Sequence, residues 1–100
     1  MDPDAIAVPF ASRSTSLLIA SGYGHLSGWS VVESAGTPAA AQLRFHDSVD
    51  TTGTILGVAK LAASGTDAGP NMDEGIRFRN GIYMEVVAGS VEGVVYIRSI

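Results

Sequence analysis

The stretch of sequence that decides the fold is GIRFRNGIYMEVVAGSVEGVVYIR, residues 75–98. It contains three runs, residues 76–79, 82–87 and 91–98, with the period of two that is typical of β-strands. Asn80-Gly81 separates the first two runs and tolerates the positive φ angles of a type I′ turn, while Ala88-Gly89-Ser90 offers a second reversal with glycine at its centre. The sequence therefore predicts a C-terminal β-meander of three strands.

Four further runs upstream also read as strands: residues 16–20, 26–33, 39–46 and 54–61. The run 54–61 is apolar on both faces, which favours a central position in a sheet. Residues 62–73 form the longest irregular stretch. The run 39–46 alternates clearly, with Ala41, Leu43 and Phe45 on one side and Gln42, Arg44 and His46 on the other. Because no segment shows a helical period, we predict an all-β antiparallel sandwich or jelly-roll-like domain of seven or eight strands.

The first 14 residues show no clean period and contain Pro3 and Pro9, which favour an extended arm. Ile6, Val8 and Phe10 are spaced by two and would line one side of such a segment. We predict an arm, residues 1–14, that lies on a neighbouring subunit, followed by one sandwich domain, residues 15–100. The alternative is a first edge strand packed on its own domain.

Composition narrows the class of protein. The chain has 100 residues, enough for one modest core, and is 46% hydrophobic and 16% charged, with a mean hydropathy of +0.27. Its net charge is −4 and its six basic residues are scattered, so no basic patch indicates a nucleic-acid partner. The absence of cysteine fits a reducing compartment. The first residues lack a secretory leader and no run is long enough to span a membrane, so we expect synthesis in the cytoplasm and no membrane partner.

The last two predicted strands carry a second apolar stripe, formed by Tyr83, Val87, Val94 and Tyr96. A monomeric sandwich leaves one face of each sheet in water, so this stripe needs a cover. We predict that another subunit supplies the cover, which makes the protein a homo-oligomer. The alternative is that the arm or the 62–73 loop folds over the stripe.

Residues with catalytic or metal-binding chemistry are present but do not form a motif. His25 and His46 lack a second ligand at metal-site spacing, and no nucleophile elbow or phosphate loop is found. The loop acids Asp47, Asp50, Asp67, Asp73 and Glu74 match no calcium-loop spacing and are interpreted as solvated. We therefore predict no enzyme activity, no catalytic residue, no metal and no cofactor.

Two other sets of side chains have alternative interpretations. Trp29, the single tryptophan, is predicted to lie in the core or an interface, although a stacking platform for a sugar is the alternative. Arg77 and Arg79 are predicted to form cross-strand ion pairs with Glu85 or Glu92. The alternative for these arginines is an acidic partner surface.

The motifs Gly69-Pro70, Gly75-Ile-Arg-Phe78, Asn80-Gly-Ile-Tyr-Met-Glu-Val86 and Gly89-Ser-Val-Glu-Gly-Val-Val-Tyr96 resemble a pattern in small β-sandwich virion proteins of tailed bacteriophages. The upstream elements Leu26-Ser-Gly28, Val32-Glu-Ser34, Leu43-Arg-Phe-His-Asp47 and Gly57-Val-Ala-Lys-Leu-Ala-Ala63 are similar to the same group, so the resemblance spans residues 25–98. It implies an antiparallel β domain that oligomerises, as a trimer, and attaches to a capsid, tail or fibre. It supplies no catalytic residue.

Two functional hypotheses follow. The first is a structural virion subunit, a capsid decoration or cement protein that docks on the major capsid protein or another virion protein. The second is a tail- or fibre-associated module that binds a carbohydrate or receptor through Tyr23, Trp29, Tyr83 or Tyr96. Aromatic side chains gathered in an open groove would favour binding, and aromatic side chains buried between subunits would favour assembly.

Overall fold

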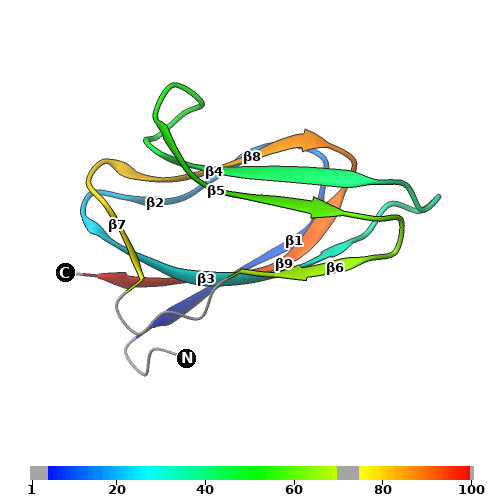
Figure 1. The fold of residues 1–100 in the computed structure, drawn as a ribbon, viewed down its shortest axis with the longest axis horizontal. Coiled ribbons are helices and arrows are strands. Elements are labelled where there is room, and N and C mark those ends of the chain that lie inside the picture. The colour runs from blue at the N-terminus through cyan, green and yellow to red at the C-terminus, as the bar shows by residue number, and fades with distance from the viewer. Residues whose placement is uncertain (1–4, 70–74, 100) are drawn as a thin grey trace.

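The computed structural model describes residues 5–69 and 75–99, and these residues form nine β-strands. Figure 1 shows the strands in two layers. The sandwich predicted from the sequence is confirmed, with nine strands rather than seven or eight. The strands are β1 (Ile6–Arg13), β2 (Leu17–Ser21), β3 (Gly24–Glu33), β4 (Ala41–Asp47), β5 (Thr54–Leu61), β6 (Thr66–Ala68), β7 (Ile76–Phe78), β8 (Gly81–Ala88) and β9 (Val91–Ser99).

The strand order is that of a jelly roll. Sheet A has the order β1-β9-β3-β6, with β7 also paired to β3, and sheet B has the order β2-β8-β4-β5. The strand pairs are nested along the chain: β1 pairs with β9, β2 with β8, β3 with β6, and β4 with β5. All these pairs are antiparallel. Nested antiparallel pairing of this kind, in which one long hairpin is wrapped into two sheets, gives the two Greek keys of a jelly roll.

The predicted C-terminal meander is wrong. Strand β7 pairs with β3, β8 pairs with β2 and β4, and β9 pairs with β1 and β3, so consecutive strands alternate between the sheets. Gly81 has a φ of +144°, but Asn80 does not have a positive φ, so the two residues do not form a type I′ turn. A Cβ at Gly81 would lie 2.5 Å from the carbonyl oxygen of Ala20, which explains the glycine. Gly89, which lies between β8 and β9 where the second reversal was predicted, has a φ of +77°.

Residues 6–13 form an edge strand of sheet A. This is the alternative given in the sequence analysis, a first edge strand packed on its own domain, and not an arm that lies on a neighbouring subunit. Strand β1 pairs with β9 from Ile6 opposite Ile97 to Arg13 opposite Val91. Pro9 is tolerated because an edge strand has one unpaired side. The expected boundary between an arm and a domain starting at residue 15 is therefore corrected, since the described part of that segment belongs to the sandwich. Residues 1–4 lie outside the described residues.

Two further expectations about the sheets are corrected. Strand β5 lies at the edge of sheet B, whereas its apolar residues predicted a central position. The stretch 62–73, predicted to be irregular, contains the short strand β6, which pairs with β3. Residues 70–74 of that stretch lie outside the described residues.

Trp29 lies in the core between the two sheets. The sequence analysis predicted a position in the core or in an interface. Its indole is 4.7 Å from the ring of Phe45, centroid to centroid, and its Nε1 donates a hydrogen bond of 2.8 Å to Asp67. Glycine is required beside the ring, because a Cβ at Gly57 or Gly69 would lie 2.7 or 2.4 Å from indole atoms. The largest fully buried side chains among the described residues are Leu26, Leu43, Phe45, Phe78, Ile82, Met84, Val91 and Val95.

The buried side chain of Glu33 fastens the loops at one end of the sandwich. Its carboxylate accepts hydrogen bonds from the backbone N–H groups of Ser64, at 2.7 Å, and Ala35, at 2.6 Å. These bonds, the one from Ser64 first, lower the pKa of Glu33 below its ordinary value because they stabilise the charged form. Glu33 therefore joins the end of β3 to the segment that connects β5 and β6.

Candidate interaction surface

The outward side of sheet B carries four of the seven large apolar side chains that are exposed among the described residues. Cross-strand partners share a face, and the registers place Leu18, Tyr83, His46 and Ile55 in one row across all four strands. The next row contains Glu85, Arg44 and Val58. We call this surface the outer face of sheet B and define it by Leu18, Gln42, Arg44, His46, Ile55, Val58, Lys60, Tyr83, Glu85 and Val87.

Four apolar side chains on this face are well exposed. Leu18, Ile55, Val58 and Val87 each expose between 39% and 48% of their surface. They come from three different strands, with β5 contributing two of them. Isolated exposed apolar residues are ordinary on a protein surface, whereas these four share one face of one sheet and are therefore candidates for a contact site.

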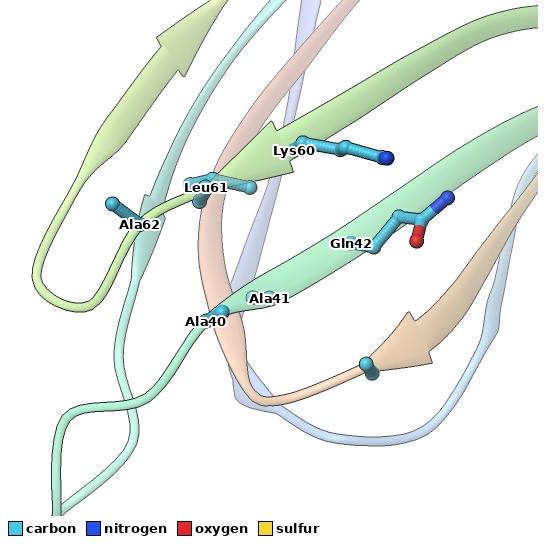
Figure 2. Close-up of a pocket in the computed structure, with 7 residues that line it drawn as sticks. Ala40, Ala41, Gln42, Lys60, Leu61 and Ala62 are labelled. Carbon is cyan, nitrogen blue, oxygen red and sulfur yellow. The ribbon is translucent and has the colours of Figure 1, made fainter.

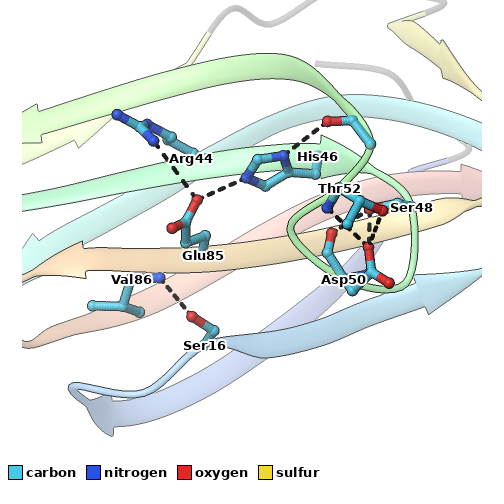
Figure 3. Close-up of polar contacts among 9 residues, drawn as sticks. Ser16, Arg44, His46, Ser48, Asp50, Thr52, Glu85 and Val86 are labelled. Atoms are coloured by element: carbon cyan, nitrogen blue, oxygen red, sulfur yellow. Dashed lines mark hydrogen bonds and ion pairs between the residues drawn. The ribbon is translucent and has the colours of Figure 1, made fainter.

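A polar cluster occupies the middle of the same face, and Figure 3 shows its members. Oε1 of Glu85 lies 2.8 Å from Nε2 of His46 and 3.9 Å from Nη1 of Arg44. The alternation predicted for residues 39–46 is confirmed, because Ala41, Leu43 and Phe45 are buried against sheet A. The outward side chains of β4 and β8 thus share one hydrogen-bonded cluster.

The loop between β4 and β5 is held by its own acids. Asp50 accepts from the N–H of Thr52 at 2.9 Å and from its hydroxyl at 2.5 Å, and the hydroxyl of Ser48 donates to the carbonyl of Asp50. The bonds from Thr52 lower the pKa of Asp50. Asp47 accepts from the N–H groups of Arg79 and Asn80. These two acids, interpreted from the sequence as solvated, are hydrogen-bond acceptors that shape one end of the sandwich.

An open pocket adjoins the outer face of sheet B (Figure 2). Its volume is about 370 Å³ and it lies where β5 ends and β4 begins. Gln42 and Lys60, which are opposite each other in register, supply its polar groups. The rest of the lining is small or apolar: Ala40, Ala41, Leu61, Ala62 and Ala88.

The structure does not bring the seven predicted interface residues together. Tyr83 and Val87 lie on the outer face of sheet B, whereas Val94 and Tyr96 lie on the outward side of sheet A, so these four do not form one stripe. The other three, Ile6, Val8 and Phe10, are paired with Ile97, Val95 and Gly93 on the inward side of β1.

The inward residues of β1 differ in exposure. Phe10 is 8% exposed and belongs to the core, whereas Ile6 is 55% exposed. Val8 is half-buried. Of these three side chains, Ile6 is therefore exposed enough to take part in an intermolecular contact, whereas Phe10 packs in the core of its own chain.

The aromatic side chains are dispersed over the molecule. Trp29 is buried between the sheets, and Tyr23 is exposed in the short connection between β2 and β3. Tyr83 and Tyr96 are half-buried on opposite faces of the sandwich. The four residues proposed from the sequence as stacking surfaces therefore do not gather in one groove.

The expected ion pairs of Arg77 and Arg79 are also wrong. Strand β7 is not a neighbour of β8 or β9, and Arg77 lies opposite His25 on β3. Glu85 instead contacts Arg44 and His46, and Glu92 lies opposite Val32. His25 is on sheet A, so the two histidines lie in different sheets.

Residues missed by the sequence analysis include Leu18, Ile55 and Val58. Each is an ordinary strand residue in its own run, and its surroundings depend on which strands become neighbours. Among residues 5–69 and 75–99, no group of three or more potential ligands could hold a metal ion, and no helix could cross a membrane.

The fold and this surface define an antiparallel jelly-roll domain with an apolar-rimmed sheet face. Comparison with protein-family models, with curated proteins and with solved structures found no match in any of the three.

Proposed function

We propose that this protein is a non-enzymatic structural subunit that self-associates through the outer face of sheet B. In this proposal it forms a closed homo-oligomer, a trimer, in which the outer face of sheet B of each copy contacts a different surface of the next copy around the ring. The trimer decorates the head of a tailed phage by docking on the major capsid protein. Its place of action is the virion, after synthesis in the host cytoplasm.

The observation that carries the proposal is the ring of four exposed apolar side chains, Leu18, Ile55, Val58 and Val87, around the cluster of Arg44, His46 and Glu85. Full burial of such a side chain is worth about 1.5–3 kcal/mol, so covering the exposed half of each contributes about 1 kcal/mol. A second copy that covers this face would also cover the pocket at Gln42 and Lys60, which adjoins it. The exposed apolar side chains would supply the contact area, and the cluster of Arg44, His46 and Glu85 would enter the interface with its charged groups already paired with one another.

The proposed virion role rests on the fold class and on the expectation from the sequence. Jelly rolls of this strand order occur in viral capsid domains, lectin domains and cupins. Among these classes, the resemblance proposed from the motifs of residues 25–98 favours a virion protein of a tailed bacteriophage. The dispersal of Tyr23, Trp29, Tyr83 and Tyr96 does not favour the sugar-binding alternative, which needs aromatic side chains in a common groove.

The experiment compares the solution masses of three proteins by light scattering. The wild-type chain is expected at a small multiple of 10.3 kDa. Val58→Lys places a charge beside Arg44 and Lys60 on the proposed interface and is expected to give a monomer with an unchanged far-ultraviolet spectrum. Ile6→Lys is the matched control, because Ile6 is similarly exposed but lies on β1 in sheet A, and it is expected to keep the wild-type mass.

Two results would contradict the proposal. One is a wild-type protein that is a strict monomer at tens of micromolar. The other is an oligomer that Ile6→Lys dissociates and Val58→Lys does not, which would move the interface to β1 and restore the predicted role of the N-terminal segment.

A further inference from the structure

The side chain of His46 is held at both of its ring nitrogens by hydrogen-bond acceptors. Nε2 lies 2.8 Å from Oε1 of Glu85, and Nδ1 lies 3.1 Å from the carbonyl oxygen of Gly53. The side chain is only 4% exposed, so water has little access to replace either partner. Figure 3 shows the ring between the two acceptors, with β8 on one side and the end of the β4–β5 loop on the other.

A neutral imidazole carries one N–H donor and one acceptor nitrogen, whereas the protonated ring carries two donors. A carbonyl oxygen accepts and never donates, and an ionised carboxylate only accepts. Both contacts of His46 are therefore satisfied together only when the ring is protonated. In the neutral ring one nitrogen lone pair would face an acceptor, which is unfavourable in a buried position.

We propose that His46 is a proton-dependent latch that fastens the β4–β5 loop, residues 48–53, to sheet B. When the ring loses its proton, the remaining N–H stays with the charged acceptor Glu85, which is the nearer partner. The contact with Gly53 is then lost. Rising pH thus releases the end of the loop, and falling pH fastens it.

The charged and titratable groups that face His46 come from each neighbouring element. Glu85 is on β8, as is Tyr83, which lies opposite His46 in register. Arg44 is on the same strand as His46 and contacts the same oxygen of Glu85.

The loop and β5 complete the surroundings. Asp50 is close enough for its charge to interact with the ring, and Asp47 follows in sequence. The cross-strand partner on β5 is Ile55, which is apolar. The pKa of Asp50 lies below its ordinary value, so this carboxylate stays charged throughout the range in which a histidine titrates.

The inference goes beyond the proposed function, because it concerns the single chain and does not require association. It nevertheless bears on the outer face of sheet B, since His46 lies in that face and Ile55 is the second residue after the loop. A loop that changes with pH would change one edge of that face.

The test uses the unaltered chain and nuclear magnetic resonance between about pH 5 and 8, the range in which histidine changes charge. Nitrogen shifts of the His46 ring report how many of its nitrogens are protonated, and backbone amide signals report the loop. We expect both ring nitrogens to be protonated at the acidic end, and the amide signals of residues 49–54 to move with the same midpoint as the His46 ring. Amide hydrogen exchange in the loop is expected to be faster at the alkaline end than base catalysis alone explains.

Two variants identify the group responsible. His25→Gln removes the other histidine of the chain and is expected to leave the loop transition unchanged. His46→Gln is expected to abolish it. If His46→Gln does not fold, the wild-type chain and His25→Gln still decide the question. Loop signals that do not move with the His46 ring, a transition lost in His25→Gln, or a ring with one protonated nitrogen at about pH 5 would each overturn the proposal.

Discussion

Nε1 of Trp29 on β3 donates a hydrogen bond of 2.8 Å to Asp67 on β6, which satisfies the one polar atom of the largest aromatic side chain in the core. The contact links two residues that are 38 positions apart in sequence and lie on neighbouring strands. Asp67 therefore fastens the short edge strand β6 to the centre of sheet A.

Removing this acceptor should destabilise the fold. Asp67→Ala leaves the indole N–H without its partner, and a buried donor left unsatisfied costs about 1–3 kcal/mol. Denaturant unfolding monitored by Trp29 fluorescence measures the loss. Asp67→Asn is the control, because its amide oxygen can still accept, and it is expected to retain most of the stability. Equal stability of Asp67→Ala and the wild type would show that the hydrogen bond is not made.

Glycine is required at position 69 by the ring of Trp29. An added Cβ would lie 2.4 Å from indole atoms, so Gly69→Ala forces the ring or the strand to move and should cost about 1–3 kcal/mol. Gly36→Ala is the matched control, since a Cβ there meets no atom within 4 Å. Thermal unfolding should show a lower midpoint for Gly69→Ala alone. If Gly69→Ala and Gly36→Ala had the same midpoint, the ring of Trp29 would not lie against residue 69.

Glu33 should make the stability of the protein depend on acid. Its pKa is lowered in the folded state by hydrogen bonds from Ser64 and Ala35, so its contribution is complete well above its ordinary pKa of 4.5. That contribution is lost as the pH falls through the lower, folded-state value. Thermal midpoints of the wild type and Glu33→Gln, measured as a function of pH, should differ at neutral pH and converge in acid. If the two curves ran parallel, the hydrogen bonds from Ser64 and Ala35 would not be stabilising the charged carboxylate of Glu33.

Phe10 tests the position of the N-terminal segment. It is buried in the core, so Phe10→Ala should cost about 3 kcal/mol or more in unfolding free energy. Ile6→Ala, on the same strand but largely exposed, should cost much less. If Phe10→Ala left stability unchanged and weakened only self-association, the segment would be an arm after all.

The period of two in residues 75–98 predicted the strands but not their partners. A short connection with glycine reverses the chain in a hairpin and also carries it from one sheet to the other, so Asn80-Gly81 indicated a turn without showing its type. The sheet to which β7, β8 and β9 each belong depends on which strands from residues 6–33 lie beside them. Those pairings join residues far apart in sequence, and alternation within one run carries no record of them.

The interaction surface was predictable only in part. The alternation of residues 39–46 indicated correctly that Arg44 and His46 point away from the core. It did not indicate that Glu85 would lie beside them, because β4 and β8 are brought together by the wrapping of the jelly roll. The same wrapping places Leu18 and Ile55 in one row and separates Tyr83 from Tyr96.

The central claim is that the outer face of sheet B mediates self-association, and a dilution series of amide spectra of the wild-type chain tests it most directly. The account predicts that dilution shifts or sharpens the signals of Leu18, Ile55, Val58 and Val87, while those of Val94 and Tyr96 on the outward side of sheet A stay constant. Changes confined to Val94, Tyr96 and the β1 strand, or spectra that do not depend on concentration, would contradict the account.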